Sequence, residues 1–314
     1  MILRTGQFTF PTPPAQLFGR EAPLMLEIGF GDGGFLTDWA ARHPDWNVLG
    51  VEISPGSMRR AFGRVRRAGL TNVRLYLGQA RFLVRNVLPQ RSLSLVYVNF
   101  PDPWPKKRHQ ERRLLQAPFF ELLSTRLADG GALRLTTDDA PYFSFALEEA
   151  EKTGLYRIEV TEPPPETRQT KYARKWQAQQ KPIYHAVFTK QAEASDPFPP
   201  SIERYDVMHH ALLEGTLPEL ERFEKLVHAF RGGHVIVLEA YRTLDGTGLL
   251  FLVRIEEEDL TQEVLVEARP KDGKVLVRVL PFGLPLSTRG TREAIRCLTE
   301  WLEAQGMRLA EAFF

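Results

Sequence analysis

The sequence predicts an α/β domain built on a parallel sheet, followed by a smaller α+β domain. Over residues 1–190, short apolar strands alternate with amphipathic helices, which favours parallel strands joined by crossover helices. The first of these strands runs into a glycine-rich turn at 29–34, as in nucleotide-binding loops. The alternation lapses at 191–201, where Pro197-Phe198-Pro199-Pro200 indicates a linker. We therefore expect one domain at 1–190 and a second at 202–314.

Each element of the first domain is predicted by a short apolar or amphipathic run. Apolar segments bounded by glycine, proline or polar residues indicate buried strands. The expected strands are 24–28, 48–52, 73–77, 93–99, 132–136, 156–160 and 183–189. The expected helices follow the glycine turn to about 42, cover the arginine-rich stretch that ends at Gly69, and span about 109–127 and 142–151. The last two strands are expected to form a hairpin with a long excursion between them.

The second domain is expected to mix helices with alternating strands. Two helical segments are predicted at about 202–214 and 218–231, and a final helix at about 291–304. Alternating apolar and polar residues between them predict strands. These strands are 234–241, 248–255, 263–268 and 275–279. Asp272-Gly273 between the last two strands indicates a hairpin turn, so we expect an α+β domain.

The composition is that of an ordinary globular protein and excludes several classes. Of the 314 residues, 43% are hydrophobic and 25% charged, and the formal net charge is +2. This small basic excess permits a polyanionic partner without requiring one. The single cysteine, Cys297, excludes an internal disulfide framework, and no apolar run is long enough to span a bilayer. Residues 1–4 do not open the apolar core of a signal peptide, so a cytoplasmic location is expected.

Several kinds of catalytic site have no counterpart in the sequence. The seven histidines form no metal-binding constellation, and the adjacent His209-His210 pair cannot chelate as an i, i+4 pair does. There is no G-x-S-x-G nucleophile elbow and no G-K-[ST] phosphate loop. We therefore expect no metal and no nucleophilic serine or cysteine chemistry.

Three polar positions near strand ends indicate a nucleoside-binding site. In Glu27-x-Gly29-x-Gly31-x-Gly33, glycines permit a tight turn and close approach of a ligand. Any turn from strand to helix favours glycine, but an acid before the glycines is typical of loops that bind S-adenosyl-L-methionine (SAM) and not of the dinucleotide G-x-G-x-x-G pattern. Glu52, at the end of the second strand, is placed to bind ribose hydroxyls. Gln79 follows the third strand, where it would either accept a hydrogen bond from an adenine amino group or simply face solvent.

The stretch from Val98 to Arg113 combines an acid, an aromatic ring and a cluster of cations. Prolines on both sides of Asp102 end the strand at 93–99 and stiffen the loop. Because open α/β sheets bind ligands at this edge, Asp102 is expected to face a bound ligand. If that ligand were a base with a free lone pair on a ring nitrogen, methyl transfer would build positive charge on it, and a carboxylate would stabilise this charge. Trp104 would stack on a base, or it would be a core residue of a rigid loop. The cations would either contact phosphates or form a solvated helix start; they are Lys106, Lys107, Arg108, Arg112 and Arg113.

The block from Asn99 to Arg113 closely resembles one found in the bacterial tRNA (guanine-N7-)-methyltransferases. Further similarities to that family are Leu26-Glu27-Ile28-Gly29-Phe30-Gly31, Gly50-Val51-Glu52, Thr136-Thr137-Asp138, Thr170-Lys171-Tyr172 and Pro182-Ile183-Tyr184. The likeness covers roughly residues 20–190. It implies a class I methyltransferase fold, a Rossmann-like seven-stranded sheet whose last strand is antiparallel, with the C-terminal region as an extension.

The resemblance also implies a reaction, which is transfer of the SAM methyl group to N7 of the variable-loop guanine, guanine 46, of tRNA. Carried over position by position, it assigns SAM binding to Glu27, Gly29, Gly31, Gly33, Glu52, Gln79 and Asp102. It makes Asp102 the active-site acid and places Lys106, Asp138 and Thr170-Lys171-Tyr172 against the substrate. Gln79 stands where the family usually has Asp or Asn, and Ala173 where it usually has Glu, so these two contacts are expected to differ.

Two other functions are compatible with the same residues. One is a non-catalytic tRNA-binding module that keeps its affinity for SAM. The other is a SAM methyltransferase for small molecules, which predicts weak RNA binding with little salt dependence. The mixed basic and aromatic residues at 168–181 favour an RNA partner. For residues 202–314 the sequence indicates the fold class but not the function. We expect this region to stabilise the enzyme or to add contacts to tRNA.

Overall fold

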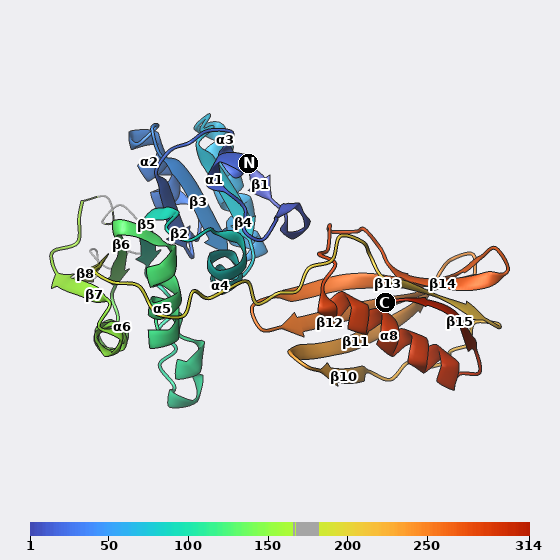
Figure 1. Ribbon diagram of the computed structural model, residues 1–314. Coiled ribbons are helices and arrows are strands. Elements are labelled where there is room, and N and C mark those ends of the chain that lie inside the picture. Colours follow the sequence, from blue (N-terminus) through green and yellow to red (C-terminus); the bar gives the residue numbers. More distant parts are fainter. Residues whose placement is uncertain (166, 168–181) are drawn as a thin grey trace. The chain divides into compact units, whose positions relative to one another are not determined.

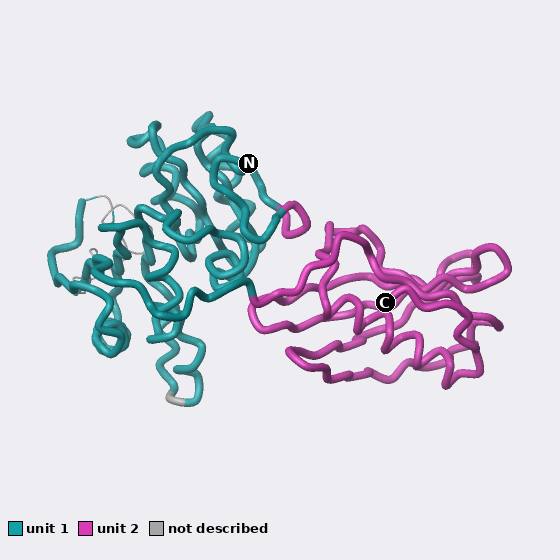
Figure 2. Tube along the Cα trace, viewed as in Figure 1, with its two compact units in different colours: residues 1–3, 8–200 teal, residues 4–7, 201–314 magenta. Residues whose placement is uncertain are grey.

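The computed structural model describes residues 1–165, 167 and 182–314, with the side chain of Lys107 left out. The chain divides into two compact units (Figure 2). Unit 1 comprises residues 1–3 and 8–200, and unit 2 comprises residues 4–7 and 201–314. Residues 191–200, most of the segment that the sequence suggests as a linker, therefore belong to unit 1.

Unit 1 is built on an eight-stranded sheet with the order β1-β4-β3-β2-β5-β6-β8-β7 (Figure 1). The strands are β1 (Ile2–Leu3), β2 (Leu24–Ile28), β3 (Asn47–Glu52), β4 (Val73–Leu77), β5 (Leu93–Asn99), β6 (Leu127–Thr137), β7 (Tyr156–Val160) and β8 (Tyr184–Lys190). β8 runs antiparallel to both β6 and β7, and the remaining pairs are parallel. The seven predicted strands and the antiparallel last strand are confirmed, and β1 adds an eighth by pairing with β4.

The helices of unit 1 follow the capping and breaking residues in the sequence. They are α1 (Pro14–Phe18), α2 (Gly34–Arg42), α3 (Pro55–Arg67), α4 (Ala80–Phe82), α5 (Ala117–Arg126) and α6 (Ala140–Thr153), with short turns of 3-10 or π helix at Leu83–Val87 and Lys107–Arg112. A further 3-10 turn, Thr5–Gln7, belongs to unit 2. Ser54 caps α3 and Asp139 caps α6, each by accepting a backbone N–H bond. The single helix predicted at 109–127 is wrong: a 3-10 turn and α5 are separated by extended backbone at Arg113 and Gln116. In the described part of the chain, no helix is long and apolar enough to cross a membrane.

The order of the strands in unit 1 reverses between β2 and β5. From β2 the chain proceeds outward to β3 and β4, and from β5 it proceeds to β6 on the other side. β2 is buried along its whole length, because β3 and β5 flank it and helices cover its faces. Ligands of open α/β sheets bind at the carboxyl ends of the strands beside such a reversal. The fold thus places the segments after β2, β3, β4 and β5 around one edge.

Segment 191–200 is held against unit 1 by buried and exposed side chains. The guanidinium of Arg126 is buried and donates to the carbonyl oxygens of Val84 and Phe198, at 3.0 and 2.6 Å. Arg85 donates to the carbonyl oxygen of Pro199 at 3.1 Å. Burial lowers the pKa of Arg126 to about 10. The proline-rich segment is therefore fixed by hydrogen bonds along its carbonyl groups.

Unit 2 is a seven-stranded antiparallel sheet packed on one long helix (Figure 1). The sheet order is β10-β11-β12-β13-β14-β9-β15. Its elements are β9 (His210–Glu214), β10 (Leu226–Phe230), β11 (Gly233–Arg242), β12 (Leu249–Glu257), β13 (Thr261–Lys271), β14 (Lys274–Val279), α8 (Arg289–Ala304) and β15 (Arg308–Phe313). Thr288 starts α8 with a reciprocal capping box to Thr291. The α+β class and the hairpin at Asp272-Gly273 are confirmed.

Two helices predicted in unit 2 are wrong. Residues 202–214 contain strand β9, and residues 218–231 contain strand β10. β9 is sandwiched between β14 and β15, and its alternate residues Ala211 and Leu213 are buried in the core. Pairing and burial on one face of the sheet therefore override the local helical spacing.

Candidate active site

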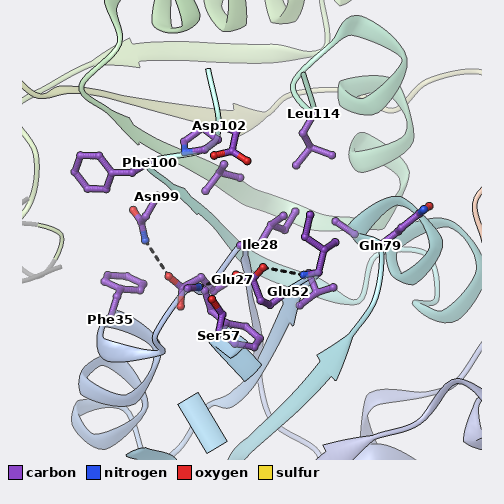
Figure 3. A pocket seen from close by; sticks show the side chains of 18 of the residues that line it. Glu27, Ile28, Phe35, Glu52, Ser57, Gln79, Asn99, Phe100, Asp102 and Leu114 are labelled. Atoms are coloured by element: carbon purple, nitrogen blue, oxygen red, sulfur yellow. Dashed lines mark hydrogen bonds between the residues drawn. The ribbon is translucent and has the colours of Figure 1, made fainter. Parts of the chain in front are cut away.

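A cavity of about 590 Å³ opens at the carboxyl edge of the unit 1 sheet. The turn after β2, the end of β3, the segment after β4 and the loop after β5 form most of its wall. Arg112, Leu114 and Tyr142 complete the wall from the following segments. Figure 3 shows Glu27 and Glu52 on one side of this cavity and Asp102 and Leu114 on the other. The cavity thus brings together residues that are 75 positions apart in the chain, Glu27 and Asp102.

The glycines after β2 have two different structural roles. Gly29 and Gly31 line the cavity with φ of +74° and +56°, a backbone conformation that glycine adopts without strain. A side chain at either position would point into open space. Gly33 is absent from the described cavity wall and is buried, and a Cβ there would lie 2.5 Å from Cβ of Ala61 on α3. Its glycine is therefore required for close packing of α2 against α3.

Glu52 holds the glycine turn and leaves its carboxylate at the cavity. Its Oε2 accepts a hydrogen bond from the backbone N–H of Gly31 at 2.9 Å. Its Oε1 accepts from the backbone N–H groups of Ile53 and Ser54, at 2.8 and 2.9 Å. A carboxylate has about four acceptor positions, so one remains for a hydroxyl of a bound ligand. Glu52 thus lines the cavity at the end of β3, and its contact to ribose stays a prediction.

Glu27 is the most deeply buried acid in the cavity wall, with 2% of its surface exposed. Burial raises the pKa of its carboxyl from 4.5 to about 8, opposed by a hydrogen bond from Asn99 and increased by the charges of Asp32 and Glu52. The Asn99 amide donates from Nδ2 to Glu27 Oε1 at 3.3 Å (Figure 3). The acid before the glycines predicts Glu27 at this site, whereas Asn99 is distinguished in the sequence only as the first residue of the block that ends at Arg113. In ligand-free protein near neutral pH, much of the Glu27 carboxyl is therefore protonated.

The loop that carries Asp102 is held in an unusual backbone conformation. Phe100 and Trp104, on either side of Asp102, have positive φ of 52° and 44°, which costs side-chain-bearing residues energy. The N–H of Phe100 donates to the carbonyl oxygen of Thr136 at 2.7 Å, which anchors the start of the loop to β6. Asp102 is exposed and lines the cavity. The loop thus presents the carboxylate of Asp102 to the space in front of the sheet.

The two adjacent arginines after this loop have different environments. The guanidinium of Arg112 lies 5.1 Å from the ring centroid of Trp104, and both residues line the cavity. Arg113 is 5% exposed, donates from Nε to the carbonyl oxygen of Pro103 at 2.9 Å, and stacks on Phe145 at 4.7 Å. Arg113 therefore fits neither alternative given for these cations, a phosphate contact or a solvated helix start, because its guanidinium is buried inside unit 1.

The remaining predicted site residues fall into three groups. Gln79 is exposed and lines the cavity beyond β4. Lys106 and Asp138 are described but do not line the cavity; Lys106 is exposed just before the turn at Lys107–Arg112, and Asp138 follows β6. The segment Thr170-Lys171-Tyr172 lies outside the described residues.

Two buried acceptors in the cavity wall allow a test of whether SAM suits this site. Glu27 Oε2 and Asn99 Oδ1 have no hydrogen-bond partner among the described residues. Buried acceptors without a donor are costly, and a ligand that carries N–H groups and positive charge would remove that cost. Glu52, at the end of β3, adds an acceptor for hydroxyls. This set of acceptors therefore fits a ligand whose ammonium and ribose hydroxyl groups donate hydrogen bonds, as those of SAM do. No group of three or more His, Cys, Asp or Glu in the described residues is arranged to hold a metal ion.

Comparison with known proteins identifies the family. A family model described as "Putative methyltransferase" matches residues 21–186. A tRNA (guanine-N(7)-)-methyltransferase of Thermus thermophilus is 51% identical over 302 residues, 96% of this chain and 96% of the relative. The chain belongs to the tRNA (guanine-N(7)-)-methyltransferases. Members from Deinococcus radiodurans and Thermotoga maritima are 44% and 33% identical, and each match covers at least 95% of both chains.

The extent of these matches differs between members of the family. The Thermus, Deinococcus and Thermotoga relatives match nearly the whole chain, so their likeness includes unit 2. The member from Halorhodospira halophila is 44% identical over 165 residues, which is 51% of this chain. The likeness to family members therefore extends over nearly the whole chain in some cases and over about half of it in others.

Proposed function

We propose that this chain transfers the methyl group of SAM to N7 of guanine 46 in the variable loop of tRNA, in the cytoplasm. The observation that carries the proposal is the single cavity in which Glu27 and Glu52 face Asp102. Full-length likeness to tRNA (guanine-N(7)-)-methyltransferases supports the substrate class. SAM, when bound, supplies an electrophilic methyl group.

The residues of the chain position both reactants and stabilise charge. Glu27 and Glu52 hold the ammonium and ribose ends of the donor, which fixes the orientation of the methyl group. N7 of guanine has a free lone pair, so no base needs to remove a proton before transfer. As the bond between the methyl carbon and N7 forms, the bond from that carbon to the sulfonium sulfur would break and leave a neutral thioether, S-adenosylhomocysteine. The positive charge would thus pass to the guanine ring, where the carboxylate of Asp102 stabilises it. Trp104 and Leu114 supply apolar surface beside it for the base.

Replacement of Asp102 tests this role. D102N keeps the size of the side chain and removes its charge, so we expect the rate of methyl transfer to fall on the order of 100-fold while the Kd for SAM stays within about threefold of the parent. The rate is measured with labelled SAM and an unmodified tRNA transcript. D129N is the matched control, because Asp129 is exposed on β6 and absent from the cavity wall. A D102N rate close to that of D129N would contradict the role of Asp102.

Mapping the methyl group tests the position. Chain cleavage at N7-methylguanine locates the modified nucleotide, and we expect a single cleavage at guanine 46. A transcript with adenine at that position should accept no label. Cleavage elsewhere would overturn the position but not the reaction. Binding of tRNA and SAM without any transfer would instead support a non-catalytic tRNA-binding protein.

A further inference from the structure

Asn99 and Glu27 are brought together by the parallel pairing of β2 and β5. In that register Glu27 lies opposite Tyr97, and Asn99 follows two residues later, so its side chain faces the same side of the sheet. Both residues stand at the carboxyl ends of their strands and line the cavity. Figure 3 shows the two side chains pointing toward each other, with a dashed line for the hydrogen bond between them.

The hydrogen bond between them fixes which atoms remain for a ligand. The Asn99 amide donates from Nδ2 to Glu27 Oε1 at 3.3 Å, and this oxygen accepts whether Glu27 is ionised or carries a proton on Oε2. Beside a bound cation, which favours the ionised carboxylate, Asn99 Oδ1 and Glu27 Oε2 are two buried acceptors with no partner in the described part of the chain. Acceptors left in this state cost free energy that a bound donor recovers. A primary ammonium group, with three N–H donors and no acceptor, is complementary to such a pair.

We propose that Asn99 and Glu27 together bind the ammonium group of the methionine portion of SAM, which makes Asn99 a specificity residue for ligands that carry an amino acid. This inference rests on the proposed use of SAM and adds a residue to it. Asn99 directs Glu27 through its Nδ2 and contacts the ligand through its Oδ1. Asn99 is expected to contact only the amino-acid end of SAM, because Glu52 and Gln79 line other parts of the cavity wall.

Three ligands separate this role from a purely structural one. SAM and S-adenosylhomocysteine both carry the ammonium group, but only SAM carries the sulfonium charge. 5′-Methylthioadenosine has the adenosine and sulfur but lacks the amino acid. For N99A we expect the Kd for SAM and for S-adenosylhomocysteine to rise by the same factor, about tenfold, while the Kd for methylthioadenosine stays within about twofold of the parent. Isothermal titration calorimetry on the full chain measures all three.

N72A is the matched control. Asn72 is also buried in unit 1, and its Nδ2 donates to the carbonyl oxygens of Ala40, His43 and Trp46, away from the cavity. We expect any change in N72A to be equal for all three ligands. The same result in N99A, or no change there, would overturn the inference. So would a loss for SAM alone, since the sulfonium would then be the recognised group. A parent chain that fails to bind SAM would overturn the proposed function together with this inference.

Discussion

The buried carboxyl of Glu27 makes the stability of the ligand-free chain depend on pH. Because burial raises its pKa to about 8 from 4.5, the folded chain keeps a proton between these values that the unfolded chain releases. The free energy of unfolding therefore falls as pH rises from about 4.5 to about 8. E27Q lacks this contribution, so we expect its stability relative to the parent to increase by a few kcal/mol over that range. Urea unfolding of both chains at about pH 5 and pH 8 measures the change, and an equal difference at the two pH values would argue against it.

Among single residues, those at strand ends could be predicted and those buried by distant elements could not. Glu27, Glu52, Gln79 and Asp102 all follow from one rule, because the carboxyl ends of parallel strands converge on one edge. The burial of Arg113 depends on Phe145 and Tyr142 of α6, about 30 positions away, and nothing local distinguishes it from its exposed neighbour Arg112. A run of Lys and Arg residues shows that a segment is positively charged, but it does not predict which of these side chains is buried and which is exposed.

At the scale of elements, the loop after β5 depends on Arg113. The Nε of Arg113 holds the carbonyl oxygen of Pro103 while the loop keeps positive φ at Phe100 and Trp104. Lysine cannot reproduce both the planar stacking on Phe145 and the directed hydrogen bond. For R113K we therefore expect kcat for tRNA methylation to fall between about 10- and 100-fold, with the Kd for SAM unchanged. Steady-state kinetics and calorimetry separate these two effects.

R126K is the control for loss of a buried guanidinium. Arg126 is buried like Arg113 and also donates to carbonyl groups, but it holds segment 191–200 and is absent from the cavity wall. We expect R126K to lower the melting temperature and to leave kcat unchanged once the chain is folded. If R113K and R126K reduced kcat equally, the Arg113 effect would be one of general stability and not of loop position.

The elements could be predicted where the apolar pattern fits only a strand. They could not be predicted where the same pattern fits both a helix and a strand. The strands of unit 1 are continuous apolar runs, as buried parallel strands require. Half of residues 218–231 are polar, and Leu220, Phe223 and Phe230 recur at intervals that suit a helix. The turn at Gly232, with φ of +102°, instead pairs β10 with β11 as a hairpin. A glycine pair directly after the segment was the one local signal for that hairpin.

At the scale of the whole molecule, charge is divided unequally along the chain. Residues 1–200 contain 27 Lys and Arg against 20 Asp and Glu, whereas residues 201–314 contain 14 against 19. The formal charges are thus +7 and −5, a difference that the value of +2 for the whole chain conceals. Contacts to phosphate dominate the affinity of proteins for nucleic acids. We therefore expect the cations of residues 1–200 to bind tRNA. The net negative charge of residues 201–314 does not favour additional tRNA binding by the C-terminal region.

Two pairs of substitutions in the full chain test this division of charge. Lys106 and Arg108 are exposed in the loop after β5, and Arg231 and Lys271 are exposed in unit 2. Each phosphate contact that is lost reduces the dependence of log K on log salt by roughly one. We therefore expect K106Q/R108Q to reduce this slope for tRNA binding by roughly two, and R231Q/K271Q to leave it unchanged. Filter binding across a series of KCl concentrations measures both slopes. Equal reductions would place phosphate contacts on unit 2 despite its net negative charge, because a local cluster of cations would then outweigh the charge of the unit.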